Sequence, residues 1–322
     1  MIMVLRCFKT VIYSGAILVM VVACKNKASK NPDTGKKTLT VAAGLDSASL
    51  INDLAYLSSE ALGGRETGTP GNALAQAYIT RRFDSLQLKQ FDSGRFQSFP
   101  LGNRSTPITG KNIIGIIPGT TYPDKYYVIS AHYDHLGTKG DKIYFGADDN
   151  ASGSACLLAL ARYFKHHPPK HSFIFTSFDA EEKGLVGSRY FVGHLPVDST
   201  KVLLNVNMDM VSRNDKNEIY ASGTWHYPFL KKYVDSIKPL TSVTVSFGHD
   251  NPSEGHNDWT NQSDHYPFHK AKIPYLYFGV EDHPDYHKPT DTFDKVDKGF
   301  YFRVCNMIRE TIVVLDRQEK LQ

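Results

Sequence analysis

Residues 126–135 read YYVISAHYDH, an apolar run that changes abruptly into a group of histidines and an aspartate. The run Tyr126–Ser130 is rich in Tyr, Val and Ile, which favour β-strands. The same change recurs where SFIFTSF (172–178) is followed by DAEE (179–182), and where VLLNV (202–206) is followed by NMDM (207–210). Each predicted strand is therefore followed directly by side chains that can bind a ligand.

Helical patterns separate these strands. Apolar residues at helical spacing predict helices over 47–57, 71–86, 152–164, 187–192, 228–237 and 300–315. Further strands are predicted over 112–117, 243–247 and 273–279, and the glycine-rich segment GGRETGTPG (63–71) is predicted to be a loop. Apolar strands that alternate with helices predict an α/β fold, a three-layer sandwich with a central mixed, largely parallel sheet and helices on both faces. Ligands in such folds bind beyond the carboxyl ends of the strands.

The start of the chain has the features of a targeting segment. Arg6 and Lys9 precede an almost wholly apolar run, Val11–Ala23, which is shorter than the about 20 residues that span a bilayer. The run ends in VVAC (21–24), which resembles the lipobox of bacterial lipoprotein signal peptides. This resemblance implies a signal peptide over 1–23 and a lipid anchor on Cys24, which would hold the protein in the cell envelope on the periplasmic or outer-membrane face. The lysine-rich residues 24–41 are predicted to be a flexible tether, and residues 42–322 a single catalytic domain.

Composition and cysteine content indicate which classes of function fit this chain. The formal net charge of +4 and the 41% of hydrophobic residues are ordinary for a globular enzyme and give no support for nucleic-acid binding. Cys156 and Cys305 fall in apolar helical patterns, which predicts buried free thiols. The sequence sets no oligomeric state. The polar segment 248–259 could form the rim of a specificity pocket or a plain surface loop.

A set of motifs in fixed order resembles a known family. The order is AHYDHLG (131–137), GADDNASG (146–153), DAEEKGLVGS (179–188), NMDM (207–210), SDHYPF (263–268) and DYHKPTDT (285–292). It is similar to that of the cocatalytic zinc aminopeptidases of metallopeptidase clan MH, over roughly residue 50 to the C-terminus. Leucyl aminopeptidases, glutamate carboxypeptidase and glutaminyl cyclase share the fold of that clan, so the resemblance implies the same fold for this chain.

The resemblance also implies two Zn²⁺ ions and the residues that bind them. Imidazole and carboxylate groups are suitable ligands for zinc. His132 and Asp209 would bind one ion, Glu182 and His287 the other, and Asp148 would bridge both. In the family, the peptide bond that follows the bridging aspartate is cis, which places it between residues 148 and 149 of this chain.

Further roles follow from the same resemblance. Glu181 would act as general base on a water between the metals, and Asp134 would orient the His132 ring. Tyr286 would donate a hydrogen bond to the carbonyl oxygen as it becomes anionic. Asp264 would contact a ligand or the substrate amine, or serve only its own loop. The substrates implied are peptides with a free N-terminus.

Three other functions are compatible with parts of this pattern. Glutaminyl cyclases of the clan use a single zinc bound by Asp, Glu and His, but His132 and Asp209 supply ligands for a second ion and favour hydrolysis. A glutamate carboxypeptidase needs basic residues for a C-terminal carboxylate, and none cluster near the motifs. A binding module that has lost its metals would not be expected to keep the full ligand set together with Glu181.

Overall fold

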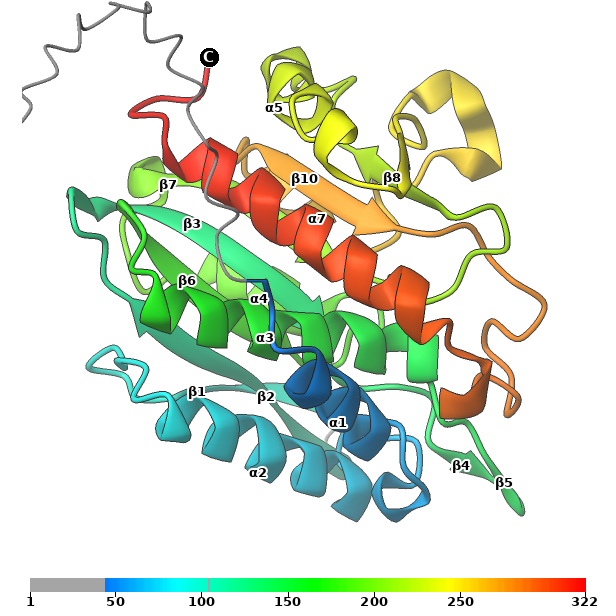
Figure 1. Cartoon of the computed structure of the whole chain (residues 1–322). Helices are drawn as coiled ribbons and strands as arrows, with labels where there is room; N and C mark the ends of the chain where they lie inside the picture. Colours follow the sequence, from blue (N-terminus) through cyan, green and yellow to red (C-terminus); the bar gives the residue numbers. More distant parts are fainter. Residues whose placement is uncertain (1–43, 104) are drawn as a thin grey trace, which may run out of the picture. The chain divides into compact units, whose positions relative to one another are not determined.

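A computed structural model of the protein describes residues 44–103 and 105–322. The predicted signal peptide (1–23), the anchor on Cys24 and the tether (24–41) lie outside the described residues. Within them, helices cover both faces of one eight-stranded sheet (Figure 1). The predicted three-layer α/β sandwich is confirmed.

The sheet is mixed, with a parallel centre. Its strand order is β1-β2-β6-β3-β7-β10-β8-β9. β3 pairs in parallel with β6 and with β7, and β7 with β10, whereas β1–β2, β2–β6 and β10–β8 are antiparallel. The strands are β1 (Phe96–Asn103), β2 (Thr106–Ile117), β3 (Tyr122–His132), β6 (His171–Phe178), β7 (Val202–Met208), β8 (Glu218–Ser222), β9 (Thr244–Ser246) and β10 (Tyr275–Gly279). A separate hairpin joins β4 (Thr138–Lys139) to β5 (Lys142–Ile143).

Each face of the sheet has its own hydrophobic core. The larger core contains buried side chains of α1 (Ser47–Leu57), α2 (Pro70–Ser85), α3 (Gly153–His166), α5 (Lys231–Asp235) and α7 (Lys298–Asp316). Of these, α1, α3 and α7 lie in front of the sheet in Figure 1. The smaller core joins Phe191 of α4 (Val186–Gly193) and Phe268 of α6 (His265–Lys270) to Phe178 of β6. Short helical turns complete the chain: η1 (Glu60–Leu62), η2 (Ala147–Ser152), η3 (Ser199–Lys201), η4 (Pro228–Leu230), η5 (Lys238–Leu240), η6 (Pro252–Asn257) and η7 (Phe293–Lys295).

Capping residues set where the main helices begin. The carboxylate of Asp46 accepts a hydrogen bond from the N–H of Ser49 at the start of α1. Thr69 caps α2, and Pro70 occupies its first turn, where a missing N–H costs nothing. This moves the start of α2 one residue ahead of the predicted Gly71.

The sequence patterns missed β1, β8 and α6, as well as the short β4–β5 hairpin. Strand β1 contains Pro100 and Gly102, which are unfavourable in central strands but tolerated at a sheet edge, where β1 lies. Strand β8 and helix α6 have only five and six residues, too few for a clear periodicity.

Two further observations concern the buried cysteines and the length of the helices. Cys156 and Cys305 are buried and free, which confirms the prediction of buried thiols. In the described ranges 44–103 and 105–322, every helix is too short or too polar to cross a bilayer.

Candidate metal centre

The predicted ligands converge because parallel strands end at one edge of the sheet. His132 is the last residue of β3 and is in register with Phe178, the last residue of β6. Asp209 directly follows β7. The loops that carry Glu182 and His287 follow β6 and β10 on the same side.

The first ligand group is centred on His132, which is buried. Its Nε2 lies 3.2 Å from Oδ1 of Asp209 and 3.5 Å from Oδ1 of Asp149. The other oxygen of Asp209 accepts a hydrogen bond of 2.7 Å from the hydroxyl of Ser263, which fixes the orientation of the carboxylate. These atoms are arranged as ligands of one cation.

The second ligand group contains Glu182 and His287. The Nε2 of His287 lies 3.1 Å from Oδ2 of Asp149 and 3.5 Å from Oε2 of Glu182. The side chain of His287 is 40% exposed, whereas that of Glu182 is 7% exposed. Asp149 therefore contacts both groups, one through each of its oxygens.

The structure corrects the bridging position predicted for Asp148. The Oδ1 of Asp148 accepts hydrogen bonds of 2.8 Å from the N–H and the hydroxyl of Ser212, and its Oδ2 lies 3.1 Å from Nε2 of His283. Both oxygens of Asp148 thus face other partners, while Asp149 lies between the two groups. The cis peptide bond is likewise one residue later than expected, between Asp149 and Asn150.

His135 is a member of the site to which the sequence assigned no role. It is buried, and its Nδ1 lies 2.7 Å from Oε1 of Glu182. Burial lowers the pKa of His135 to about 3, so its ring is neutral at neutral pH. A neutral ring that donates from Nδ1 holds the Glu182 carboxylate in place. The sequence signal for His135 was its position three residues after His132 in the motif AHYDHLG (131–137).

Glu181 belongs to the first group rather than to the second. One of its carboxylate oxygens lies within 4.8 Å of the ligand atoms of His132 and Asp209. Burial raises the pKa of Glu181 well above its usual range, and the nearby Asp209 and Asp264 raise it further. A carboxylate of raised pKa beside a metal-binding group is suited to accept and return a proton.

Asp134 holds the loop that carries Glu181 and Glu182. Its carboxylate accepts hydrogen bonds from the N–H groups of Glu181 at 3.1 Å and Glu182 at 3.3 Å. Its Oδ1 lies 3.6 Å from Nδ1 of His132, and its main-chain carbonyl lies nearer, at 3.2 Å. Asp134 therefore contacts the His132 ring mainly through its backbone, while its carboxylate positions Glu181.

Asp291 supports the turn that carries Asp149. Its carboxylate accepts hydrogen bonds from the N–H groups of Asp148 at 3.0 Å and Asp149 at 3.1 Å. Burial raises the pKa of Asp291 to about 7, and the neighbouring Asp148 contributes to the rise. The sequence contained Asp291 in the motif DYHKPTDT but gave no reason to single it out.

The two remaining predicted residues lie next to the ligand groups. Asp264 is fully buried, and burial raises its pKa to about 7. The ring of Tyr286 stacks on that of His287, with centroids 3.9 Å apart. Burial also raises the pKa of Tyr286, so its hydroxyl stays protonated and able to donate a hydrogen bond.

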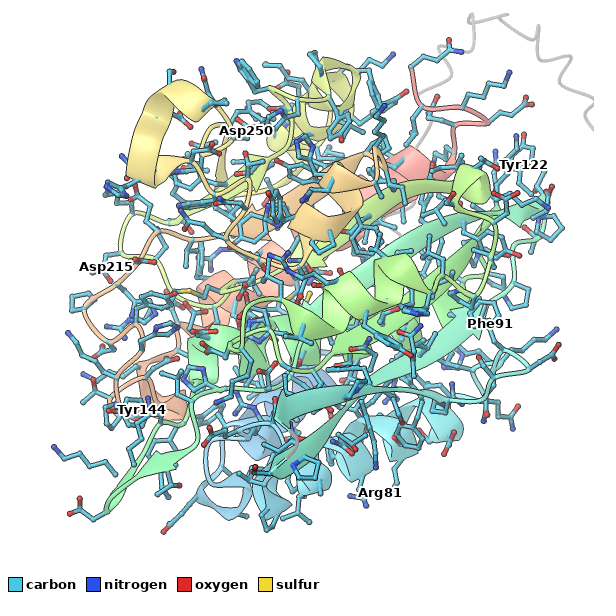
Figure 2. All side chains as sticks on the ribbon, turned by 180° about the vertical axis from the view of Figure 1, so that it is seen from behind. Arg81, Phe91, Tyr122, Tyr144, Asp215 and Asp250 are labelled. Atoms are coloured by element: carbon cyan, nitrogen blue, oxygen red, sulfur yellow. The ribbon has the colours of Figure 1, made fainter. Side chains whose placement is uncertain are left out.

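A cavity of about 330 Å³ opens over the ligand groups. Besides the ligands, its wall includes Leu185, Met210, Trp259, Tyr277, Val280 and Tyr286. The Trp259 ring stacks on His249 at 3.6 Å with an interplanar angle of 4°. Asp250, labelled in Figure 2, holds this segment through hydrogen bonds from the N–H groups of Gly223 and Trp225. The segment 248–259 thus contributes Trp259 to the cavity wall.

The donor set fits divalent zinc. Seven aspartates of this region are buried: Asp134, Asp148, Asp149, Asp179, Asp209, Asp264 and Asp291. Burial raises the pKa of Glu182 to about 7 and also raises that of Asp149. So much buried negative charge is unfavourable unless cations compensate it. Zinc would bind to carboxylate and imidazole donors that the fold already brings together.

Comparison with known proteins agrees with this chemistry. Residues 112–312 match the family described as Peptidase family M28, and the match includes every predicted ligand. The chain belongs to peptidase family M28.

Curated proteins of similar sequence include zinc metalloproteases and an aminopeptidase. The chain is 30% identical to aminopeptidase YwaD of Bacillus subtilis over 223 residues, which are 66% of this chain and 46% of that protein. The chain thus spans about half the length of the curated relatives it matches.

Solved structures with the same fold include two kinds of enzyme. An aminopeptidase of Aneurinibacillus sp. strain AM-1 aligns with a TM-score of 0.69 at 17% identity, over 86% of this chain and 96% of that chain. A glutaminyl cyclase of Bacteroides thetaiotaomicron aligns with a TM-score of 0.68 at 19% identity, over 86% of this chain and 99% of that chain. Fold similarity therefore does not separate these two activities.

Proposed function

We propose that this M28 protein is a di-zinc aminopeptidase that hydrolyses the first peptide bond of peptides with a free N-terminus. The observation that carries the proposal is the position of Asp149, whose two oxygens contact the His132 group and the His287 group separately. A carboxylate shared in this way suits two ions rather than one.

The proposed ligands follow from these contacts. His132 and Asp209 would hold one zinc, and Glu182 and His287 the other, with Asp149 shared between them. When bound, zinc ions lower the pKa of a water molecule and polarise a substrate carbonyl. His135 keeps Glu182 oriented through its contact of 2.7 Å.

The chain's own residues would then move the proton and hold the substrate. The carboxylate of Glu181 would take a proton from the attacking water and give it to the departing amine, because it lies beside the ligand atoms of His132 and Asp209. The hydroxyl of Tyr286 would donate to the carbonyl oxygen as negative charge develops there. Trp259 and Tyr277 would enclose the N-terminal side chain in the cavity.

A glutaminyl cyclase is the second candidate, because the solved glutaminyl cyclases have the same fold. That reaction expels ammonia as an N-terminal glutamine closes on its own side chain, and in the clan it uses a single zinc. The pairing of His132 with Asp209 argues against it, since these two residues form a ligand group separate from that of His287.

One paired assay separates the two candidates. The purified full-length chain is given aminoacyl-p-nitroanilides in one arm and an N-terminal glutaminyl peptide in the other, each with and without a zinc chelator. Release of p-nitroaniline that the chelator abolishes is the expected result. Cyclisation without p-nitroaniline release would replace the aminopeptidase proposal with the cyclase.

We also propose that the chain is exported and held in the cell envelope through a lipid on Cys24. The support is the sequence alone, in the order of positive residues, apolar run and VVAC (21–24). A peptidase placed there would act on peptides outside the inner membrane.

A further inference from the structure

Arg65 is a buried charged residue to which neither the ligand groups nor the proposed mechanism assigns a role. It lies in the glycine-rich segment 63–71 and is only 1% exposed. Its backbone is left-handed, with φ of +54°, which is uncommon for a residue other than glycine. Removing a guanidinium from water is costly unless its N–H groups are all well bonded.

Every hydrogen bond of the Arg65 side chain ends on a main-chain carbonyl. Nε donates to Tyr133 at 2.8 Å, and Nη2 donates to Gly146 at 2.9 Å. Nη1 donates to both Phe145 and Leu57. Among the described residues, no carboxylate oxygen lies within the 4.0 Å of an ion pair with it.

These carbonyls belong to the segments that carry the ligands. Tyr133 directly follows His132, and Gly146 precedes Asp149 by three residues. Figure 2 labels Tyr144, which follows the β4–β5 hairpin and leads into this second segment. The guanidinium thus joins the loop after β3 to the turn that bears the shared carboxylate.

Close packing around Gly146 leaves this arrangement little freedom. A Cβ at Gly146 would lie 2.1 Å from the carbonyl oxygen of Asp149 and 2.5 Å from the His135 ring. The carbonyl of Arg65 in turn accepts hydrogen bonds from the N–H of His135 at 3.4 Å and from Asn72 at 3.1 Å. The planar fork of an arginine holds several carbonyls at fixed directions, which the single ammonium of a lysine does not.

The charge of Arg65 is stabilised by nearby carboxylates, with Asp149 and Asp291 contributing most. Burial lowers its pKa to about 10, so the group stays protonated at neutral pH. A fixed positive charge beside a metal centre repels cations and by itself weakens their binding. A gain in metal affinity from Arg65 must therefore come from its hydrogen bonds rather than from its charge.

We propose that Arg65 is a positioning residue of the metal centre, which holds the His132 loop and the Asp149 turn at the separation that the shared ligand groups require. The inference rests on the proposed function only in taking zinc as the ion, and it is independent of whether the reaction is hydrolysis or cyclisation.

The test measures zinc affinity of the full-length chain by competition with a chromogenic chelator. Arg65→Lys keeps the charge and loses the fork, and Arg65→Met loses both. We expect each variant to bind zinc about 10- to 100-fold more weakly, as for other residues that orient metal ligands. If charge dominated instead, Arg65→Met would bind zinc more tightly than the wild type.

Ile312→Ala is the matched control. Ile312 is fully buried in α7 and packs in the larger core, away from the carbonyls that Arg65 contacts. The substitution should lower the melting temperature and leave zinc affinity within about twofold, because metal binding to the native state is insensitive to distant destabilisation.

Several results would overturn the inference. They are wild-type affinity in folded Arg65→Lys, an equal loss of affinity in Ile312→Ala, or tighter binding by Arg65→Met. Failure of both Arg65 variants to fold even with zinc present would also overturn it and assign Arg65 to stability alone. Absence of zinc binding by the wild type would instead overturn the proposed function.

Discussion

The Nε2 of His283 lies 3.1 Å from Oδ2 of Asp148, directly behind the ligand groups. This contact joins the segment that carries His287 to the turn that carries Asp149. Two neighbouring aspartates therefore serve different purposes, since Asp149 faces the proposed metals and Asp148 holds the surrounding chain.

Substitution of the two aspartates should give different metal contents. Asp149→Ala removes the carboxylate that both groups share, so we expect fewer than two zinc ions per chain by elemental analysis after gel filtration. Asp148→Asn keeps the shape of the side chain and should retain two ions when zinc is in excess. The opposite pattern would restore Asp148 as the bridging ligand.

Replacement of the proposed base should separate turnover from metal binding. Glu181→Gln preserves the size of the side chain but cannot accept the proton, so kcat for an aminoacyl-p-nitroanilide should fall by about 10²- to 10⁴-fold. Zinc content should stay at two. Glu66→Gln is the control, because Glu66 forms an exposed ion pair with Lys183 and should have little effect. Unchanged turnover in Glu181→Gln would remove its assignment as base.

Trp259, whose ring lines the cavity, should determine which N-terminal residues are released fastest. In Trp259→Ala we expect kcat/KM to fall about tenfold or more for leucyl and phenylalanyl p-nitroanilides, because each loses apolar contact worth 1–2 kcal/mol. The alanyl substrate, which reaches the ring less, should lose less than about threefold.

Trp225→Ala provides the comparison for that experiment. Trp225 is 52% exposed and does not line the cavity. Its removal should leave the order of substrates unchanged. An equal loss for all three substrates in Trp259→Ala would mean that the ring supports the loop rather than the specificity.

The cap of the last helix should contribute measurably to stability. The carboxylate of Asp297 accepts a hydrogen bond of 2.9 Å from the N–H of Phe300 at the start of α7. Asp297→Ala should lower the free energy of unfolding by about 1 kcal/mol, measured by urea denaturation. Asp141→Ala, in the exposed turn between β4 and β5, should change it by less than about 0.5 kcal/mol.

Membrane association should depend on a single sulfur atom. Cys24→Ser removes the thiol that would carry the lipid, so the protein should move from the membrane to the aqueous fraction after cell lysis. Peptidase activity per molecule should be unaltered. Continued sedimentation with membranes would contradict the proposed anchor.

The sequence predicted most of the sheet and nearly all of the residues that converge on the candidate site for one physical reason. Apolar strands that run parallel bring their carboxyl ends to one edge, so polar residues that follow them must meet there, as His132 and Asp209 do. Helices such as α1 and α7 were equally legible, since apolar periodicity acts locally.

Other features depend on contacts that leave no pattern in the sequence. Asp148 and Asp149 are chemically identical neighbours, and only the path of the turn 147–152 decides which one faces the ligands. Arg65 bonds to carbonyls, which every residue possesses, so no partner in the sequence marks it. Strand β1 is held by pairing with β2 rather than by its own composition.

The unequal exposure of the two histidine ligands has a kinetic consequence. The side chain of His132 is 1% exposed, whereas that of His287 is 40% exposed. A chelator entering from solvent meets the His287 position first. Zinc should therefore leave the protein in two phases, a rapid one from the outer position and a slow one from the buried His132 position.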